Sequence, residues 1–228
     1  MTEVHDPLMT AVGLRKAFGR TEALRGVSMT LAPGEVLAVT GPSGSGKSTL
    51  LLCLAGVLRP EAGHVQYAGQ RLDELSESRR TRLRRRELGL VLQFGQLVPE
   101  LTGVQNVMMP LLLDRHDRAA ARTSSLGWLE RLGAGQVADV VPGEMSGGEA
   151  QRVAVARALV AGPRVVFADE PTGALDTLSG ERVLEALLSS ARDTGAAVVL
   201  VTHDNRVAAT ADREIVLRDG RADPRLVT

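Results

Sequence analysis

The sequence has few lysines and no excess of charge of either sign. Of its 27 basic side chains only Lys16 and Lys47 are lysines, and the 27 acidic side chains bring the formal net charge to zero. A neutral chain has no overall field that would draw it to nucleic acid or to an anionic membrane. Any attachment to a membrane is therefore expected to be local or to act through a partner.

Cysteine and long apolar runs are also scarce. The single cysteine, Cys53, cannot form an internal disulfide and lies in an apolar run, which predicts a buried side chain and a reducing, cytosolic setting. No apolar run approaches the ~20 residues of a spanning helix, and the N-terminus lacks the pattern of a signal peptide. With one cysteine and four histidines at scattered positions, no zinc site is expected.

Aromatic residues are rare, with one tryptophan, one tyrosine and three phenylalanines. This matters for the basic run at 79–86, because nucleic-acid-binding surfaces usually interleave aromatics with basic residues. We expect this run to form a solvated face of an amphipathic helix over 76–86, with contact to anionic lipid headgroups as an alternative. Trp128 is expected in the core of a helical region.

Strand and helix patterns alternate along the chain. Short strands with turn signals occupy the first 70 residues, and a helical region follows from 102 to 133. Further helices are expected near 148–161 and 177–194, and a short one after Asp204. Buried strands are expected at 35–40, 88–93, 164–169 and 196–203. This order predicts an α/β fold with a mostly parallel core sheet, a β-rich lobe and a helical lobe.

The stretch GPSGSGKST, from Gly41 to Thr49, explains why one lysine is retained. It matches G-x-x-x-x-G-K-[ST] and lies between a buried strand and a helix, which is the context this phosphate-binding motif requires. Glycines let backbone N–H groups surround phosphate oxygens, and the helix N-terminus favours an anion. Lys47 supplies a compact ammonium that an arginine fork would not replace.

Two further stretches complete the expected site. Asp169 ends an apolar strand and is followed by Glu170, so one carboxylate is placed to hold Mg²⁺ and the next to polarise a water molecule. The stretch SGGE, Ser146 to Glu149, opens an apolar helix and reads either as a second phosphate cradle or simply as a helix N-cap. If both cradles bind one nucleotide, they must face each other within the chain or between two chains.

With these motifs in this order, the sequence resembles an ABC-type ATPase subunit over nearly its whole length. The resemblance implies a P-loop NTPase fold of ABC type, with an antiparallel β lobe and a helical subdomain. It implies a single domain over 1–228, with the catalytic core in 1–100 and 162–228 and the helical subdomain at about 101–161. The chain is expected to have no appended regulatory domain.

The resemblance also assigns roles to residues. Lys47, Glu170 and His203 would be catalytic, and Ser48, Gln93 and Asp169 would serve Mg²⁺. Gln93 matches the Q-loop, Asp176 the D-loop and Phe18 an adenine-stacking aromatic. The full set of expected nucleotide contacts is Phe18, Gly41, Pro42, Ser43, Gly44, Ser45, Gly46, Lys47, Ser48, Thr49, Gln93, Ser146, Gly147, Gly148, Glu149, Asp169 and Asp176.

Finer features resemble the MacB, LolD and FtsE branch, which implies ATP and Mg²⁺ as cofactors and a head-to-tail ATP-dependent homodimer. A separate membrane permease would be moved by the cycle. It would dock on Gln93 and the segment Phe94–Leu101, in which Leu97, Val98 and Leu101 are expected to be exposed apolar residues. The chain would be peripheral at the inner face of the membrane, powering export or extraction of a substrate. An FtsE-like regulator of cell-wall hydrolases is the alternative, and a soluble ATPase acting on DNA or ribosomes is disfavoured, so no nucleic-acid partner is expected.

Overall fold

The computed structural model describes residues 6–93, 96–173 and 175–223. The chain divides into two compact units, one formed by Met1–Thr81 with Ala197–Thr228 and the other by Arg82–Ala196. Helix α2 (Glu77–Glu87) spans the boundary between them. Among the described residues, no helix combines the length and the apolar character needed to cross a membrane.

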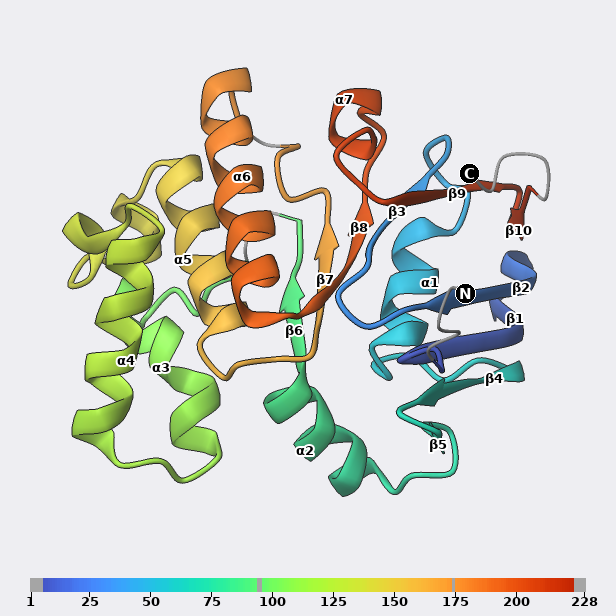
Figure 1. Cartoon of the computed structure of the whole chain (residues 1–228), viewed down its shortest axis with the longest axis horizontal. Helices are drawn as coiled ribbons and strands as arrows, with labels where there is room; N and C mark the ends of the chain where they lie inside the picture. The colour runs from blue at the N-terminus through green and yellow to red at the C-terminus, as the bar shows by residue number, and fades with distance from the viewer. Residues whose placement is uncertain (1–5, 94–95, 174, 224–228) are drawn as a thin grey trace, which may run out of the picture. The chain divides into compact units, whose positions relative to one another are not determined.

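The first unit contains an antiparallel sheet with the strand order β2-β1-β4-β5. Its strands are β1 (Met9–Phe18), β2 (Thr21–Leu31), β4 (Ala62–Tyr67) and β5 (Gln70–Arg71). The long pair β1 and β2 shows alternating burial, as expected for strands with one face against a core. This sheet is the predicted β-rich lobe (Figure 1).

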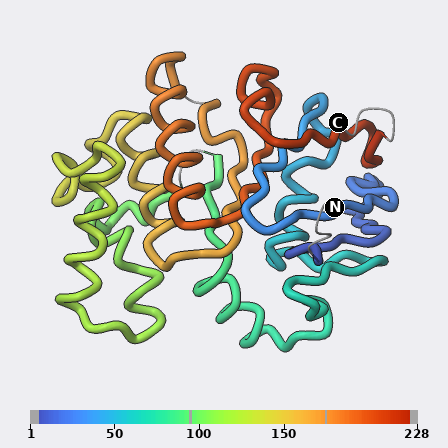
Figure 2. Tube along the Cα trace, in the orientation of Figure 1, coloured from blue at the N-terminus to red at the C-terminus, as the bar shows by residue number. Residues whose placement is uncertain are grey.

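The same unit contains a set of parallel strands. Strand β3 (Val36–Thr40) pairs in parallel with β8 (Ala197–Val201) on one side and with β9 (Arg213–Arg218) on the other, and β10 (Arg221–Ala222) adds antiparallel to β9. All five residues of β3 and of β8 are buried, which explains their continuous apolar sequences. Figure 2 traces the chain from β3 into α1 (Lys47–Leu54) and from β8 into α7 (Asn205–Ala208).

The second unit is largely helical. Strands β6 (Leu88–Val91) and β7 (Val165–Asp169) form a parallel pair. The helices are α3 (Gly103–Leu113), α4 (Arg118–Arg131), α5 (Gly147–Leu159) and α6 (Thr177–Thr194), with 3-10 turns at Gly135–Val137 and Pro142–Glu144. The parallel pair, the helices and the antiparallel sheet confirm the predicted α/β class.

Helix α6 shows how the sequence specifies such an element. Asp176 caps its N-terminus by accepting a hydrogen bond from the Ser179 N–H at 3.0 Å, and Gly195 ends it in a left-handed conformation. Its buried positions repeat every three or four residues, for example Val183, Leu187 and Ala191. This period places one apolar face against the unit's core.

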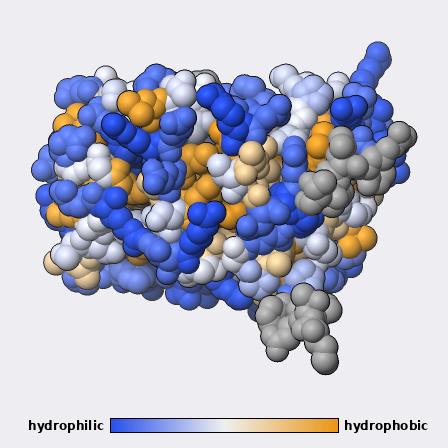
Figure 3. All heavy atoms as spheres, turned by 45° about the horizontal axis from the view of Figure 1, so that its top comes forward, coloured by the Kyte–Doolittle hydropathy of each residue, from blue (hydrophilic) through white to orange (hydrophobic). Residues whose placement is uncertain are grey.

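Of two expectations about burial, the one for Trp128 needs correction and the one for Cys53 is confirmed. Trp128 is only half-buried, and its ring lies under the Arg131 guanidinium at 5.1 Å, whereas the neighbouring Leu129 is the core residue. Cys53 is buried as predicted. On the face drawn in Figure 3, hydrophilic side chains dominate and apolar residues lie interspersed among them.

Candidate functional site

The loop between β3 and α1 has a backbone that only glycine accommodates at two points. Gly41 has φ +136°, and a Cβ there would lie 2.1 Å from the Leu217 carbonyl oxygen. Gly46 has φ +102°, and its Cβ would lie 2.2 Å from the Ala23 carbonyl oxygen. Both contacts are with backbone, which cannot move aside as a side chain would. Gly41 and Gly46 are therefore required by the packing of the loop itself.

This loop gathers hydrogen-bond donors at the start of a helix. Helix α1 begins at Lys47, and its first N–H groups have no intrahelical acceptor, as at every helix start. The N-cap residue, Gly46, offers them no side-chain acceptor either. Lys47 as a whole is only 8% exposed, and its ammonium donates to the Gly41 and Pro42 carbonyl oxygens at 2.8 and 3.0 Å. The Ser45 hydroxyl is buried and has no hydrogen-bond partner within the described part of the chain. Such a set of donors suits an anionic group with several oxygens.

His203 and Phe18 belong to the same unit as the loop. Val39 and Val201 are register partners in the parallel pair β3–β8, so the segments after these strands leave the same edge of the sheet. His203 lies on one of these segments and is exposed, as the position after a strand allows. Phe18 ends β1 with 52% of its surface exposed, and the Lys16 ammonium lies 5.5 Å from the centroid of its ring. An exposed ring of this kind can stack on a planar base.

The second unit carries the predicted carboxylates and the Q-loop glutamine. Val91 and Ala168 are register partners in β6 and β7, so Gln93 and Asp169 follow from the same edge of this parallel pair. Gln93 is exposed, whereas Asp169 is 8% exposed at the end of β7. Glu170 adopts φ +47°, which is uncommon for a residue with a side chain. Strained backbone of this kind tends to occur at functional sites.

The oxygen donors of Ser48, Gln93 and Asp169 fit a hard divalent cation such as Mg²⁺ in chemistry. No cluster of three or more histidine, cysteine or acidic side chains that could hold a metal exists among the described residues. Mg²⁺ is usually bound through one or two carboxylates together with substrate phosphates and water. The common part of Ser48, Gln93 and Asp169 in holding such an ion stays a prediction.

The helix start at Ser146 is a complete capping box. The Ser146 hydroxyl accepts from the Glu149 N–H at 3.3 Å, and the Ser146 N–H donates to the Glu149 carboxylate at 2.8 Å. The hydroxyl also donates to this carboxylate at 2.7 Å, and these bonds lower the pKa of Glu149. The N-cap interpretation is thus observed in this chain. The phosphate contacts of Ser146, Gly147, Gly148 and Glu149 stay predictions.

Asp176 likewise has a structural role in this chain. It caps α6, and its hydrogen bonds with Ser179 lower the pKa of its carboxyl group. Its role as a D-loop contact stays a prediction, and Ala174 of the same motif lies outside the described residues.

The segment after Gln93 differs from the expectation of an exposed apolar surface. Phe94 lies outside the described residues, and Leu97, Val98 and Leu101 are half-buried rather than exposed. The physical reason is Asn106 of α3, which is fully buried and bonds repeatedly to the backbone of this segment. Its amide oxygen accepts from the Val98 N–H at 2.8 Å, and its amide nitrogen donates to the Val98 and Leu101 carbonyls at 3.1 and 2.9 Å and to the Thr102 carbonyl at 3.1 Å.

A second residue that the sequence reasoning missed holds the start of this segment. Arg157 of α5 donates to the Gln96 carbonyl oxygen at 2.9 Å, and burial lowers the pKa of its guanidinium. Gln96 itself has φ +44°, so the chain bends sharply where Arg157 binds it. The available sequence signal was the same for Asn106 in α3 and Arg157 in α5. Each is a polar side chain among apolar residues of a helix.

The comparisons with known proteins can now be set beside this geometry. Residues 24–173 match the family model described as ABC transporter. The chain belongs to the ABC transporter family. It is accordingly an ABC ATPase that binds and hydrolyses ATP, acting as the ATP-binding subunit of a membrane transporter complex.

Several relatives resemble this ABC ATPase over nearly all of its length. The lipoprotein-releasing system ATP-binding protein LolD of Bordetella pertussis is 44% identical over 230 residues, which cover 98% of the chain and 100% of that protein. The LolD of Shewanella frigidimarina is 44% identical over 88% of the chain and 84% of that protein. These matches confirm the resemblance to the branch that contains LolD.

A solved structure resembles the ABC ATPase equally well. The ATP-binding cassette MJ0796, in a dimeric post-hydrolysis state bound to ADP and Pi, superimposes with a TM-score of 0.89 at 34% identity, covering 94% of the chain and 96% of that protein. The match confirms the predicted fold of an ABC ATPase cassette. It also confirms the expected ATPase class, since that cassette was captured with hydrolysis products.

Proposed function

We propose that the site residues described above carry out the hydrolysis of ATP. They belong to one domain spanning 1–228, in which 1–100 and 162–228 form the core and about 101–161 form a helical subdomain. The observation that carries the proposal is the Lys47 ammonium, held by two carbonyls of a loop in which Gly41 and Gly46 admit no side chain. In this proposal Lys47 and the loop N–H groups, from Gly41 to Thr49, bind the phosphates of ATP. Phe18 stacks on the adenine.

The remaining roles follow from chemistry. Ser48, Gln93 and Asp169 hold Mg²⁺, which neutralises the charge that develops on the phosphates. The Glu170 carboxylate accepts a proton from the attacking water, and its left-handed backbone fixes the direction in which the side chain projects. His203 donates a hydrogen bond to the γ-phosphate.

Two copies of the chain share each nucleotide in this proposal, because Ser146 opens a second helix start that suits phosphate. The dimeric MJ0796 cassettes support such pairing by similarity. The test combines two inactive variants, Lys47→Ala and Ser146→Arg. In a mixed dimer both lesions fall in one composite site, and the other site is intact.

A purified mixed dimer is therefore expected to retain ATP that neither parent retains, and turnover is measured alongside. Serine-to-arginine fills the space in front of the helix, so the variant's fold is checked by its thermal midpoint. If mixed dimers form but retain no more ATP than the parents, the two chains do not share their sites.

We propose lipoprotein release from a membrane as the process that this ATPase powers, because the LolD relatives named above are described as parts of a lipoprotein-releasing system. A separate integral membrane permease transmits the motion, and the chain works at the inner face of the membrane through that partner. These relatives support transport over regulation of cell-wall hydrolases.

The experiment reconstitutes the chain and its membrane partner in vesicles that contain a triacylated lipoprotein. ATP is expected to release the lipoprotein, whereas Glu170→Gln should abolish release without loss of assembly. A version of the cargo without acyl chains provides the matched substrate control. ATP hydrolysis without release of the acylated cargo would refute the substrate while leaving the ATPase assignment intact.

A further inference from the structure

The end of α2 and the end of α3 enclose a pocket that the ATPase site does not use. One cavity of about 390 Å³ concentrates basic side chains in a chain with no net charge. Its lining residues are Arg82, Arg85, Arg86, Leu113, Asp114 and Arg115. Four arginines face one carboxylate there, so the cavity has a formal excess of three positive charges.

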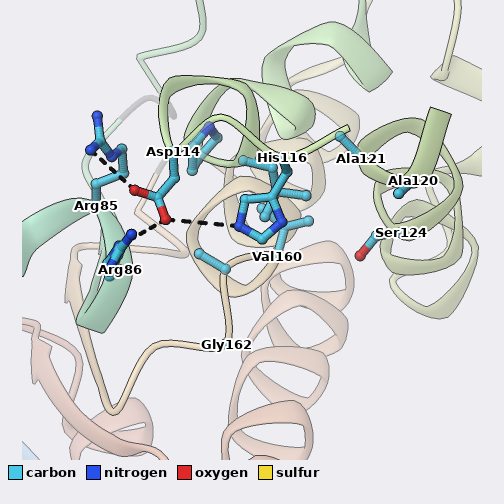
Figure 4. A pocket seen from close by; sticks show the side chains of 12 residues that line it. Arg85, Arg86, Asp114, His116, Ala120, Ala121, Ser124, Val160 and Gly162 are labelled. Atoms are coloured by element: carbon cyan, nitrogen blue, oxygen red, sulfur yellow. Dashed lines mark hydrogen bonds and ion pairs between the residues drawn. The ribbon is translucent and has the colours of Figure 1, made fainter. Parts of the chain in front are cut away.

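Asp114 organises two of these arginines but does not neutralise the rest. Its carboxylate accepts a hydrogen bond from Arg86 Nε at 2.7 Å and forms an ion pair with Arg85 Nη2 at 3.1 Å. His116 Nε2 lies 3.8 Å from the same carboxylate (Figure 4). The Arg85 Nε is buried and has no hydrogen-bond partner in the described part of the chain. Within those residues Arg82 and Arg115 form no ion pair.

Arg115 reaches the cavity from an unusual backbone position. Arg115 follows the C-terminus of α3 with φ +64°, and its N–H donates to the Leu112 carbonyl oxygen at 3.0 Å. Glycine is the favoured residue at such a left-handed helix end, because a Cβ is unfavourable there. The arginine is thus kept at a conformational cost, and its side chain lines the cavity.

The surroundings favour an amphiphile over a simple anion. Leu113, which lines the basic cavity, is 60% exposed, and the adjacent Leu112 is 37% exposed. A second cavity of about 460 Å³ shares Arg85, Arg86 and Asp114 with the first. Its other walls include the apolar side chains of Ala121 and Val160 (Figure 4), together with that of Leu111. Basic side chains beside exposed leucines and an apolar wall match a phosphate joined to a hydrocarbon.

We propose that the surface formed by the two cavities is a binding site for the headgroup of an anionic phospholipid. Arg82 and Arg115 bind the headgroup phosphate, and Arg85 and Arg86, held in place by Asp114, add to the positive field. Leu112 and Leu113 enter the adjoining acyl region. The site attaches the ATPase to the membrane independently of its permease.

The test measures partition of the isolated chain onto vesicles of phosphatidylglycerol mixed with phosphatidylcholine, with pure phosphatidylcholine vesicles as reference. The double variant Arg82→Gln with Arg115→Gly is expected to lose roughly tenfold in affinity for the anionic vesicles, because each arginine near such a surface contributes severalfold to binding. The control removes two exposed arginines of α6 that line neither cavity, Arg182→Gln with Arg192→Gln, and should bind within twofold of the parent.

Folding is monitored separately. None of the substituted arginines belongs to the proposed nucleotide site, so ATP turnover should be unchanged in both double variants. Arg115→Gly alone should leave the thermal midpoint unchanged or raise it, because it relieves the left-handed backbone. The variant Leu113→Ser is expected to weaken vesicle binding as well, since a soluble phosphate would not need the leucine.

Three results would overturn the proposal. The first is equal binding of the two double variants to anionic vesicles, or no binding by the parent chain. The second is vesicle binding that Leu113→Ser leaves unchanged while the parent chain binds inorganic phosphate as tightly as it binds the vesicles at constant ionic strength, which would assign the site to a soluble phosphate. The third is a combination of two observations: the Arg82→Gln, Arg115→Gly variant no longer assembles with the permease in detergent, and the parent chain does not bind vesicles. This combination would assign the site to a protein partner. Each leaves the ATPase assignment intact.

Discussion

Replacing Asn106 by alanine tests how the segment that follows the Q-loop is held. The buried amide accepts one hydrogen bond from the Val98 N–H, and its two N–H groups are shared among the carbonyls of Val98, Leu101 and Thr102, which amounts to about three full hydrogen bonds. Each such bond contributes about 1 kcal/mol net to stability. Half-exposed backbone groups of the segment regain some water, so we expect a loss of about 3 kcal/mol in the free energy of unfolding.

A loss of this size should be visible as a thermal shift. For a chain of this length it corresponds to a decrease of roughly 6–12 °C in the unfolding midpoint. The control is Asn205→Ala, which changes the chain's other asparagine at an exposed position of α7 and should shift the midpoint little. The assay is differential scanning calorimetry of the parent and both variants at one pH.

Asn106→Asp separates the hydrogen bonds from the volume of the side chain. Aspartate has nearly the same size, but its carboxylate presents an acceptor to three carbonyl oxygens where the amide donated. We expect it to be at least as destabilising as alanine. A loss below ~1 kcal/mol for Asn106→Ala, or a normal midpoint for Asn106→Asp, would refute the conclusion that these hydrogen bonds hold the segment.

The other predictions concern the nucleotide and the thiol. Lys47→Ala should abolish ATP turnover and weaken ATP binding, because a charge-assisted contact to phosphate is lost; a fluorescent ATP analogue measures the affinity, and near-normal turnover would contradict the assignment. Glu170→Gln should bind ATP, hydrolyse it very slowly and elute as a dimer with Mg-ATP in size-exclusion chromatography, whereas fast hydrolysis would exclude Glu170 as the base. Burial raises the pKa of the Cys53 thiol to about 11, so thiolate is scarce below that pH. A soluble thiol reagent at pH 8 should therefore react slowly with the folded chain and rapidly after denaturation, and equal rates would show that the thiol is accessible.

The sequence by itself determined the features that depend on neighbouring residues. The phosphate loop was predictable, because its glycines, Lys47 and Ser48 act through backbone conformation and the start of one helix. Helix α6 was predicted with its observed limits, because an N-cap aspartate, a C-terminal glycine and a repeating apolar face are local signals. The buried strands β3, β7 and β8 followed from their continuous apolar runs in the same way.

Only the tertiary structure decided which residues meet across elements. Leu97, Val98 and Leu101 are apolar around a proline, so their sequence is typical of an exposed docking loop, but Asn106 draws that loop against α3. The partnership of Arg157 with Gln96 was likewise decided by packing between segments distant in sequence. The four arginines at the end of α2 and α3 form one cavity because two helix ends converge on Asp114. The physical reason is that hydrophobic periodicity specifies which face of a helix is buried, whereas polar contacts depend on the positions that packing gives to residues distant in sequence.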